Sequence, residues 1–141
     1  MSSPTQLQPL TAGMVRLARE PSFAQLATIN PDGSPQLSQV WVDTDGQYLL
    51  VNTAAGRQKV RNVRRDPRVT LQVIDPRDAY RLFVAQGRVV EIATVGADEH
   101  IDRLAQKYLG QERYPWRRPG EQRLILKIAP ERIRAGTTPL D

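Results

Sequence analysis

Two Asp-Gly turns between short apolar stretches constrain the fold of this chain more than any other feature. Asn30-Pro31-Asp32-Gly33 separates the first two β-rich stretches, and Asp43-Thr44-Asp45-Gly46 separates the second from a third. An Asp-Gly pair flanked by such stretches is a strong signal for a hairpin between antiparallel strands. The sequence therefore predicts a three-stranded antiparallel meander over residues 22–53.

Three more strands and three helices are predicted in the chain. The apolar residues of the helices recur every three or four positions, and those of the strands form short β-rich runs. Thr11 is placed to cap the first helix, which Pro21 ends. The predicted helices are Thr11–Glu20, Gly56–Arg65 and Ala97–Tyr108, and the predicted strands are Val69–Ile74, Tyr80–Ile92 with a bend at Gly87, and Leu124–Ala129.

Six strands with turn-length connections predict a mainly β fold with flanking α-helices, arranged as a small antiparallel barrel. The chain of 141 residues is close to the usual size of one domain, so a single domain over residues 1–141 is expected. No secretory leader and no apolar run long enough to cross a bilayer are evident. We therefore expect a cytoplasmic protein that is not embedded in a membrane.

Few side chains are suited to catalysis. The chain has no cysteine and one histidine, which excludes thiolate metal sites and cysteine–histidine nucleophile pairs. His100 lies within the third predicted helix, where we expect a surface or boundary position, and no Gly-x-Ser-x-Gly motif is present. The acidic residues occupy turns, without the spacing of a metal site. No catalytic residue is assigned, and a bound cofactor is expected to supply the reactive group.

The stretch "NTAAGRQKVRNVRRDPRVTL", residues 52–71, concentrates positive charge at the end of a predicted strand. Arg57 and Lys59 fall at the start of the second helix, where cations oppose the helix dipole unless an anion neutralises them. A phosphate group is therefore expected there. The net charge of +5 is equally compatible with a solvated basic surface. Nucleic-acid binding is disfavoured because the sequence contains no nucleic-acid-binding motif. A solvated helix face is expected for the remaining basic residues, Arg61, Arg64, Arg65 and Arg68.

Two motifs in combination carry a family resemblance: LAT-x3-DG-x-PQLS-x2-W over residues 26–41, and GR-x-K-x-RN-x-RRDPR over residues 56–68. The chain resembles the pyridoxamine 5′-phosphate oxidase-like split β-barrel family, and more narrowly its B-type F420 (deazaflavin)-dependent reductases. The similarity runs from Pro21 to Arg134. It implies a six-stranded split β-barrel core over residues 21–134, preceded by an N-terminal helical segment of residues 1–20 and followed by a tail of residues 135–141. It also implies a homodimer with cofactor sites at the subunit interface.

The resemblance also implies a set of cofactor-binding residues. Arg57 and Lys59 would bind the cofactor phosphate, with Arg61 and Asn62 close behind. Asn52, Thr53 and Ala54 would border the phosphoribityl arm. The strand after the first Asp-Gly turn would run beside the ring through Gln36, Leu37, Ser38 and Val40. Trp41, Tyr80 and Trp116 are candidates for ring or substrate contact, with aromatic packing as the alternative and the second subunit as a possible source.

The implied reaction is hydride transfer from reduced F420 to an unsaturated small-molecule acceptor, with a proton from solvent or a tyrosine. The family members that oxidise pyridoxamine phosphate carry a C-terminal Arg-x-His motif, and this chain has no histidine after His100. FMN is the alternative cofactor, because Arg57 and Lys59 would serve its phosphate equally well. F420 is favoured because its phosphodiester and glutamate tail would match extra arginines such as Arg117 and Arg118. A non-catalytic flavin or deazaflavin carrier is the second hypothesis.

Overall fold

The computed structural model describes residues 6–140; residues 1–5 and 141, which belong to the predicted N-terminal segment and tail, lie outside the described residues. The chain alternates short helices with antiparallel strands. In chain order the elements are α1 (Ala12–Arg19), β1 (Phe23–Ile29), β2 (Pro35–Val40), β3 (Val42–Thr44), β4 (Leu49–Ala54), α2 (Gln58–Arg65), β5 (Arg68–Asp75), β6 (Asp78–Ala93), α3 (Ala97–Leu109) and β7 (Arg123–Ala135).

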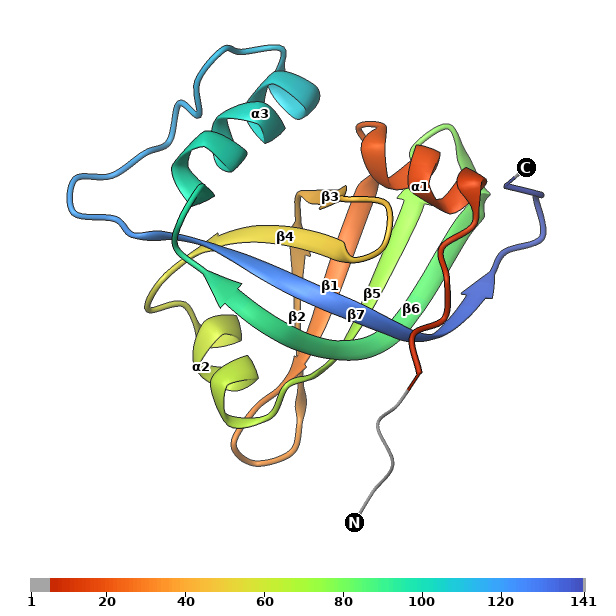
Figure 1. Ribbon diagram of the computed structural model, residues 1–141, viewed down its shortest axis with the longest axis horizontal. Helices are drawn as coiled ribbons and strands as arrows, with labels where there is room; N and C mark the ends of the chain where they lie inside the picture. Colours follow the sequence, from red (N-terminus) through yellow and green to blue (C-terminus); the bar gives the residue numbers. More distant parts are fainter. Residues whose placement is uncertain (1–5, 141) are drawn as a thin grey trace.

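The strands form one antiparallel sheet in the order β2-β1-β5-β6-β7-β4-β3. The sheet curls into a half-open barrel, and the three helices lie at separate places around it (Figure 1). The long β6 and β7 pair along most of their length and sweep across the molecule. The predicted fold class, a mainly β split barrel with flanking helices, is confirmed.

The described residues contain seven strands, where the sequence predicts six, because the second predicted strand is interrupted at Trp41. The segment before Trp41 is β2, whose Val40 pairs with Ala24 of β1. The segment after it is β3, whose Val42 pairs with Val51 of β4. The chain thus passes at Trp41 from one edge of the sheet to the other. This corner closes the barrel at the place where its two edge strands approach each other.

Helix α1 forms as the sequence predicts. The Thr11 side chain accepts a hydrogen bond from the Met14 amide at 3.2 Å and caps the helix. The helix buries Leu17 and Ala18 completely and packs against β3 and β5. Helix α2 packs against β1, and α3 packs against β7 and β4. These contacts close parts of the barrel wall.

The core lies on the inner face of the curled sheet. Alternate residues such as Leu26, Leu71 and Phe83 are fully buried there. The bend predicted at Gly87 coincides with a shift in the β6–β7 register. A Cβ atom at Gly87 would lie 1.9 Å from the Ala129 carbonyl oxygen, so the two backbones approach closely only because position 87 has no side chain.

Candidate functional site

A hollow of about 250 Å³ opens where the two edges of the sheet approach each other. Its walls come from the corner between β2 and β3, from β4, from the start of α2, from α3 and β7, and from the loop that joins them. The residues that line it are Gln39, Val40, Trp41, Asn52, Thr53, Arg57, Lys59, Ile101, Tyr114, Trp116 and Arg123. We call this hollow the edge pocket.

Lys59 is the most informative residue of the edge pocket. Its side chain is 7% exposed, and it makes no hydrogen bond or ion pair with any residue between 6 and 140. Burial, and then the neighbouring charges of Arg57 and Arg123, lower the pKa of Lys59 below its usual value. A buried ammonium group without a counter-ion is costly, and this cost is relieved when an anion binds beside it. The edge pocket is therefore suited to an anionic group.

Thr53 supplies a second unsatisfied polar group. The residue is 2% exposed, and its Oγ1 atom has no hydrogen-bond partner among the described residues. Arg57 is the N-cap residue of α2, and no side chain caps that helix. The amide groups of the first helical turn therefore also lack a side-chain acceptor. All three features are expected of a site that receives an acceptor-rich ligand such as a phosphate.

Arg123, which sequence reasoning did not select, is buried in the edge pocket with 5% exposure. Its Nε atom donates to Asn52 Oδ1 at 2.9 Å, and its Nη1 atom donates to Glu121 Oε1 at 2.6 Å. The Asn52 amide in turn donates to the Ala97 carbonyl at 2.8 Å and contacts His100 Nδ1 at 3.1 Å. Asn52, predicted as a cofactor contact, therefore has both polar atoms engaged within the protein. The one signal for Arg123 in the sequence is its position, as a charged residue at the start of a predicted apolar strand.

His100 is buried, so the prediction of a surface or boundary position is wrong. Its exposure is 1%, and its Nε2 atom lies 3.3 Å from Asp43 Oδ2. Because the Asn52 amide donates to Nδ1, the ring carries its proton on Nε2 and donates it to Asp43. Burial opposes ionisation of Asp43, but hydrogen bonds from His100 and the Thr44 amide, with the charge of Lys107, lower its pKa. His100 lies next to the inward-facing residues of α3. The helical pattern alone did not predict that His100 itself is buried.

Four aromatic rings form one wall of the edge pocket and the layer behind it. Trp41 stacks on Tyr108 with ring centroids 5.1 Å apart. It meets Tyr114 edge-on at 5.8 Å and Trp116 at 6.1 Å. Trp116 remains 59% exposed. The structure thus brings together two of the three aromatic residues predicted for ring or substrate contact, Trp41 and Trp116.

Tyr80, the third predicted aromatic residue, lies outside the edge pocket. It is near the start of β6, 67% exposed, and its carbonyl oxygen accepts a hydrogen bond from the Thr138 amide. A contact between Tyr80 and the ligand of this pocket would have to come from a second subunit.

The four residues predicted on β2 divide between the two faces of the sheet. Gln36, Ser38 and Val40 pair with buried residues of β1 on the inner face, whereas Leu37 faces outward and is 67% exposed. The Gln36 side chain accepts a hydrogen bond from the Thr28 hydroxyl at 3.0 Å. Ser38 Oγ is buried without a partner among the described residues. Of these four, Val40 lines the edge pocket.

Three other predicted residues lie close to the edge pocket without lining it. The Arg61 side chain donates to the Gly56 carbonyl and to Gln58, which fixes the start of α2. Asn62 is fully buried, and its amide donates to Thr28 and Asn30 at 3.0 Å each. Ala54 is buried in β4 beside Thr53. Asn62 therefore holds α2 against β1 and the turn that follows it, whereas Arg61 stabilises the start of α2 itself.

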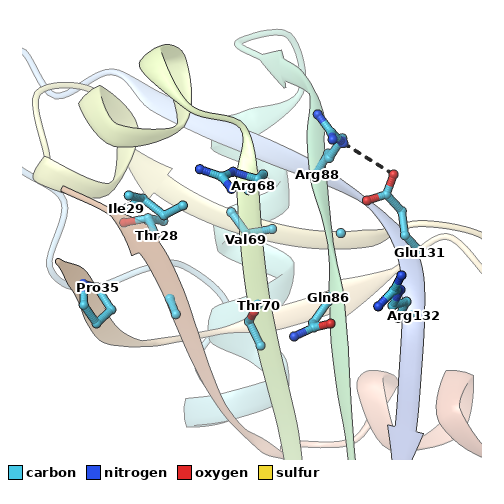
Figure 2. Close-up of a pocket in the computed structure, with 12 residues that line it drawn as sticks. Thr28, Ile29, Pro35, Arg68, Val69, Thr70, Gln86, Arg88, Glu131 and Arg132 are labelled. Atoms are coloured by element: carbon cyan, nitrogen blue, oxygen red, sulfur yellow. Dashed lines mark ion pairs between the residues drawn. The ribbon is translucent and has the colours of Figure 1, made fainter. Parts of the chain in front are cut away.

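A larger hollow, of about 470 Å³, lies on the outer face of β1, β5, β6 and β7. Figure 2 shows Thr70, Gln86 and Arg132 side by side across three of these strands, with Arg88 paired to Glu131 at 3.5 Å. It contains none of the predicted site residues. Its arginines are exposed, and two of them already have carboxylate partners, Arg68 with Asp66 and Arg88 with Glu131. The edge pocket is the better candidate site because Lys59 and Arg123 are buried in it and Lys59 has no counter-ion among the described residues.

Between residues 6 and 140, no three His, Cys, Asp or Glu side chains gather in a way that could hold a metal ion. None of the helices in the same range is long and apolar enough to cross a membrane.

Comparison with known proteins finds one family model and several solved structures that are similar to this chain. The model of the pyridoxamine 5′-phosphate oxidase family matches residues 10–135. A solved structure of an F420 reductase is 29% identical, with 89% of this chain and 98% of that chain covered and a TM-score of 0.76. The conserved hypothetical protein Rv2991 from Mycobacterium tuberculosis is 26% identical, with 96% and 89% covered and a TM-score of 0.64. HupZ of Group A Streptococcus, at 21% identity with 92% and 99% covered and a TM-score of 0.62, shares the fold.

Proposed function

The chain belongs to the pyridoxamine 5′-phosphate oxidase family, and from that membership and the edge pocket we propose that it is an F420-dependent reductase. When bound and reduced, the deazaflavin would supply a hydride to an unsaturated organic acceptor, and solvent or a tyrosine would supply the proton. The likeness to an F420 reductase over nearly the whole of both chains supports the choice of cofactor. FMN would satisfy the same phosphate site and is the alternative cofactor.

The observation that carries this proposal is the buried, unpaired Lys59. Its charge is stabilised when a phosphate binds between Lys59 and Arg57. The Thr53 hydroxyl supplies a further donor, and the uncapped first turn of α2 supplies backbone amides. These groups would bind and orient the cofactor through its phosphate. A ligand held at that end has its remaining length free to lie along the β2 edge of the barrel.

The aromatic wall would provide the apolar part of the site. Trp41 lies at the corner between β2 and β3, and Trp116 adds a half-exposed ring beside it. Such rings would contact a planar ligand and exclude water from the hydride-transfer region. The Tyr114 ring packs under Arg123, with the guanidinium carbon 5.1 Å from its centroid, and so joins the aromatic wall to the charged end of the edge pocket.

A homodimer is part of the proposal. The edge pocket is smaller than the roughly 300–1,000 Å³ usual for small-molecule sites, which supports its completion by a second copy of the chain. The outer face of the sheet offers an apolar row for such contact, because Phe23, Ile74 and Leu82 pair in register across β1, β5 and β6. Phe23 is 49% exposed and Leu37 on β2 is 67% exposed.

Single-turnover reduction distinguishes a reductase from a cofactor carrier. The protein is mixed with reduced F420 and one acceptor at a time, either a quinone or an α,β-unsaturated carbonyl compound. Oxidation of the cofactor is followed by absorbance. The proposal expects protein-dependent oxidation with at least one acceptor class and its loss in Lys59→Ala. Tight binding of F420 that stays reduced with every acceptor would contradict the reductase assignment and support a carrier.

A further inference from the structure

We propose that Arg123 is a third anion-binding residue of the edge pocket, and that Asn52, His100 and Asp43 are positioning residues that hold its guanidinium toward the anion. This inference rests on the proposed function of the same pocket. The fold brings these four residues together from β3, β4, α3 and β7.

The donors of Arg123 are only partly used. A guanidinium group has five N–H donors, and two of its nitrogens, Nε and Nη1, bond to Asn52 and Glu121. The Nη2 atom has no partner within residues 6–140. Arg123 opens β7 opposite Ala54, the last residue of β4, so the guanidinium lies beside the segment that leads to Arg57 and Lys59. The remaining N–H groups are therefore placed to donate to the anion that Lys59 lacks.

A chain of buried hydrogen bonds fixes the direction of that guanidinium. Asp43 accepts from His100, His100 accepts from Asn52, and the Asn52 carbonyl oxygen accepts from Arg123. Asn52 is 7% exposed and His100 is 1% exposed. In such a chain of hydrogen bonds, each side chain restricts the orientation of the next. Asp43 is thereby linked to the edge pocket through His100 and Asn52.

The charges also indicate what kind of anion fits. Arg57, Lys59 and Arg123 contribute three positive charges, and Glu121, paired with Arg123 at 2.6 Å, contributes one negative charge. The balance of two positive charges matches a ligand group with two negative charges. A phosphate monoester, as in FMN, has this charge on one group. A phosphodiester followed by a carboxylate, as in the tail of F420, has it on two adjacent groups.

The first test is equilibrium titration of the full-length protein with F420 and with FMN, followed by ligand fluorescence. Arg123→Ala should weaken binding of the preferred cofactor about ten- to a hundredfold, because a charge-assisted contact is lost. Arg103→Ala, which removes an exposed arginine from α3, is the matched control and should leave affinity unchanged. Arg123→Lys keeps the charge but cannot donate several hydrogen bonds in the planar geometry of a guanidinium. Its affinity should therefore lie between that of Arg123→Ala and that of the Arg103→Ala control.

The second test is a double-mutant cycle that separates positioning from general stability. His100→Ala should weaken cofactor binding several-fold in the wild-type background and have no further effect in the Arg123→Ala background. A purely structural role would instead weaken binding by the same factor in both. If His100→Ala fails to fold by circular dichroism, His100→Asn, which retains an acceptor toward Asn52, replaces it in the cycle.

The outcomes distinguish the inference from the function on which it rests. Arg123→Ala affinity equal to that of Arg103→Ala, with Lys59→Ala still impaired, would overturn the role of Arg123 and leave the phosphate site intact. Additive effects in the cycle would overturn the positioning role of His100. Binding of neither F420 nor FMN by the wild-type protein would overturn both the inference and the proposed function.

Discussion

At the scale of single residues, the edge pocket is defined by three positive charges, of which Lys59 and Arg123 are buried. Lys59 is buried with no partner among the described residues, whereas Arg57 is exposed at the start of α2. Lys59→Ala and Arg57→Ala should each weaken cofactor binding by roughly 1.5–3 kcal/mol, or about ten- to a hundredfold. The loss should be larger for Lys59 because its contact is shielded from solvent. Fluorescence titration measures both affinities.

Arg64→Ala is the matched control for these two variants. Arg64 lies on the same helix but is exposed and does not line the edge pocket. Its substitution should leave cofactor affinity within experimental error. Equal losses in all three variants would mean that the general positive field of α2, and not a specific phosphate contact, binds the cofactor.

Cofactor affinity should also depend on pH through Lys59. Burial and the charges of Arg57 and Arg123 lower its pKa in the free protein, and a bound anion raises that pKa again. Between these two pKa values, binding must take up a proton, so affinity falls as pH rises through that window and is unaffected by Lys59 below it. Titrations from neutral pH to about 9.5 measure the slope.

Lys59→Arg provides the control for this pH dependence, because a guanidinium stays charged over the whole range. Its affinity profile should be flat where the wild-type profile falls. A wild-type profile as flat as that of Lys59→Arg would show that Lys59 does not titrate with the ligand.

The residues that line the edge pocket were predictable from sequence only where the signal was local. Arg57 and Lys59 were found because their charges collect at a helix start, which a short window reveals. Arg123 was missed because its partner Asn52 is 71 positions away, and only the β4–β7 pairing brings the two together. His100 was misplaced because its burial depends on Asn52 and Asp43, which lie on other elements.

At the scale of elements, the close pairing of β6 with β7 depends on the absence of a side chain at Gly87. A Cβ atom there would meet the Ala129 carbonyl oxygen at 1.9 Å, so Gly87→Ala must displace backbone. We expect this change to lower the free energy of unfolding by about 3 kcal/mol. Urea denaturation measures the change.

Gly33→Ala is the comparison for Gly87→Ala. Position 33 has a φ of 87° but nothing within 4 Å of an added Cβ, so its cost is left-handed backbone strain alone, about 1 kcal/mol. A cost at Gly87 no greater than that at Gly33 would contradict the close approach of β6 and β7.

The order of strands and turns was largely predictable, because Asp-Gly turns and apolar periodicity are local properties. The interruption at Trp41 was not, since Pro35–Val40 and Val42–Thr44 continue one alternating pattern. What separates them is the choice of partner strand, β1 for the first and β4 for the second. The partner of each strand depends on how the whole barrel closes, so it cannot be predicted from a short window of sequence.

At the scale of the whole molecule, the proposed dimer should use the outer face of the sheet. Leu37 is 67% exposed on that face, and Leu37→Glu places a charge there. The molar mass measured by light scattering should therefore fall from that of two chains to that of one. Cofactor affinity should fall with it, because the second copy completes the site. Val95→Glu, at an 89% exposed position before α3, should change neither property.

A wild-type protein that is monomeric at all concentrations, or a Leu37→Glu variant that remains dimeric, would contradict this placement of the interface. Loss of the dimer with unchanged cofactor affinity would show instead that one chain forms the whole binding site.

The central claim, that the edge pocket binds the phosphate end of F420, is tested most directly by side-by-side titration of the purified protein with F420 and FMN at physiological salt. The account predicts micromolar or tighter binding of F420, much weaker binding of FMN, and a large loss for F420 in Lys59→Ala. Preference for FMN, or equal binding by wild type and Lys59→Ala, would contradict it.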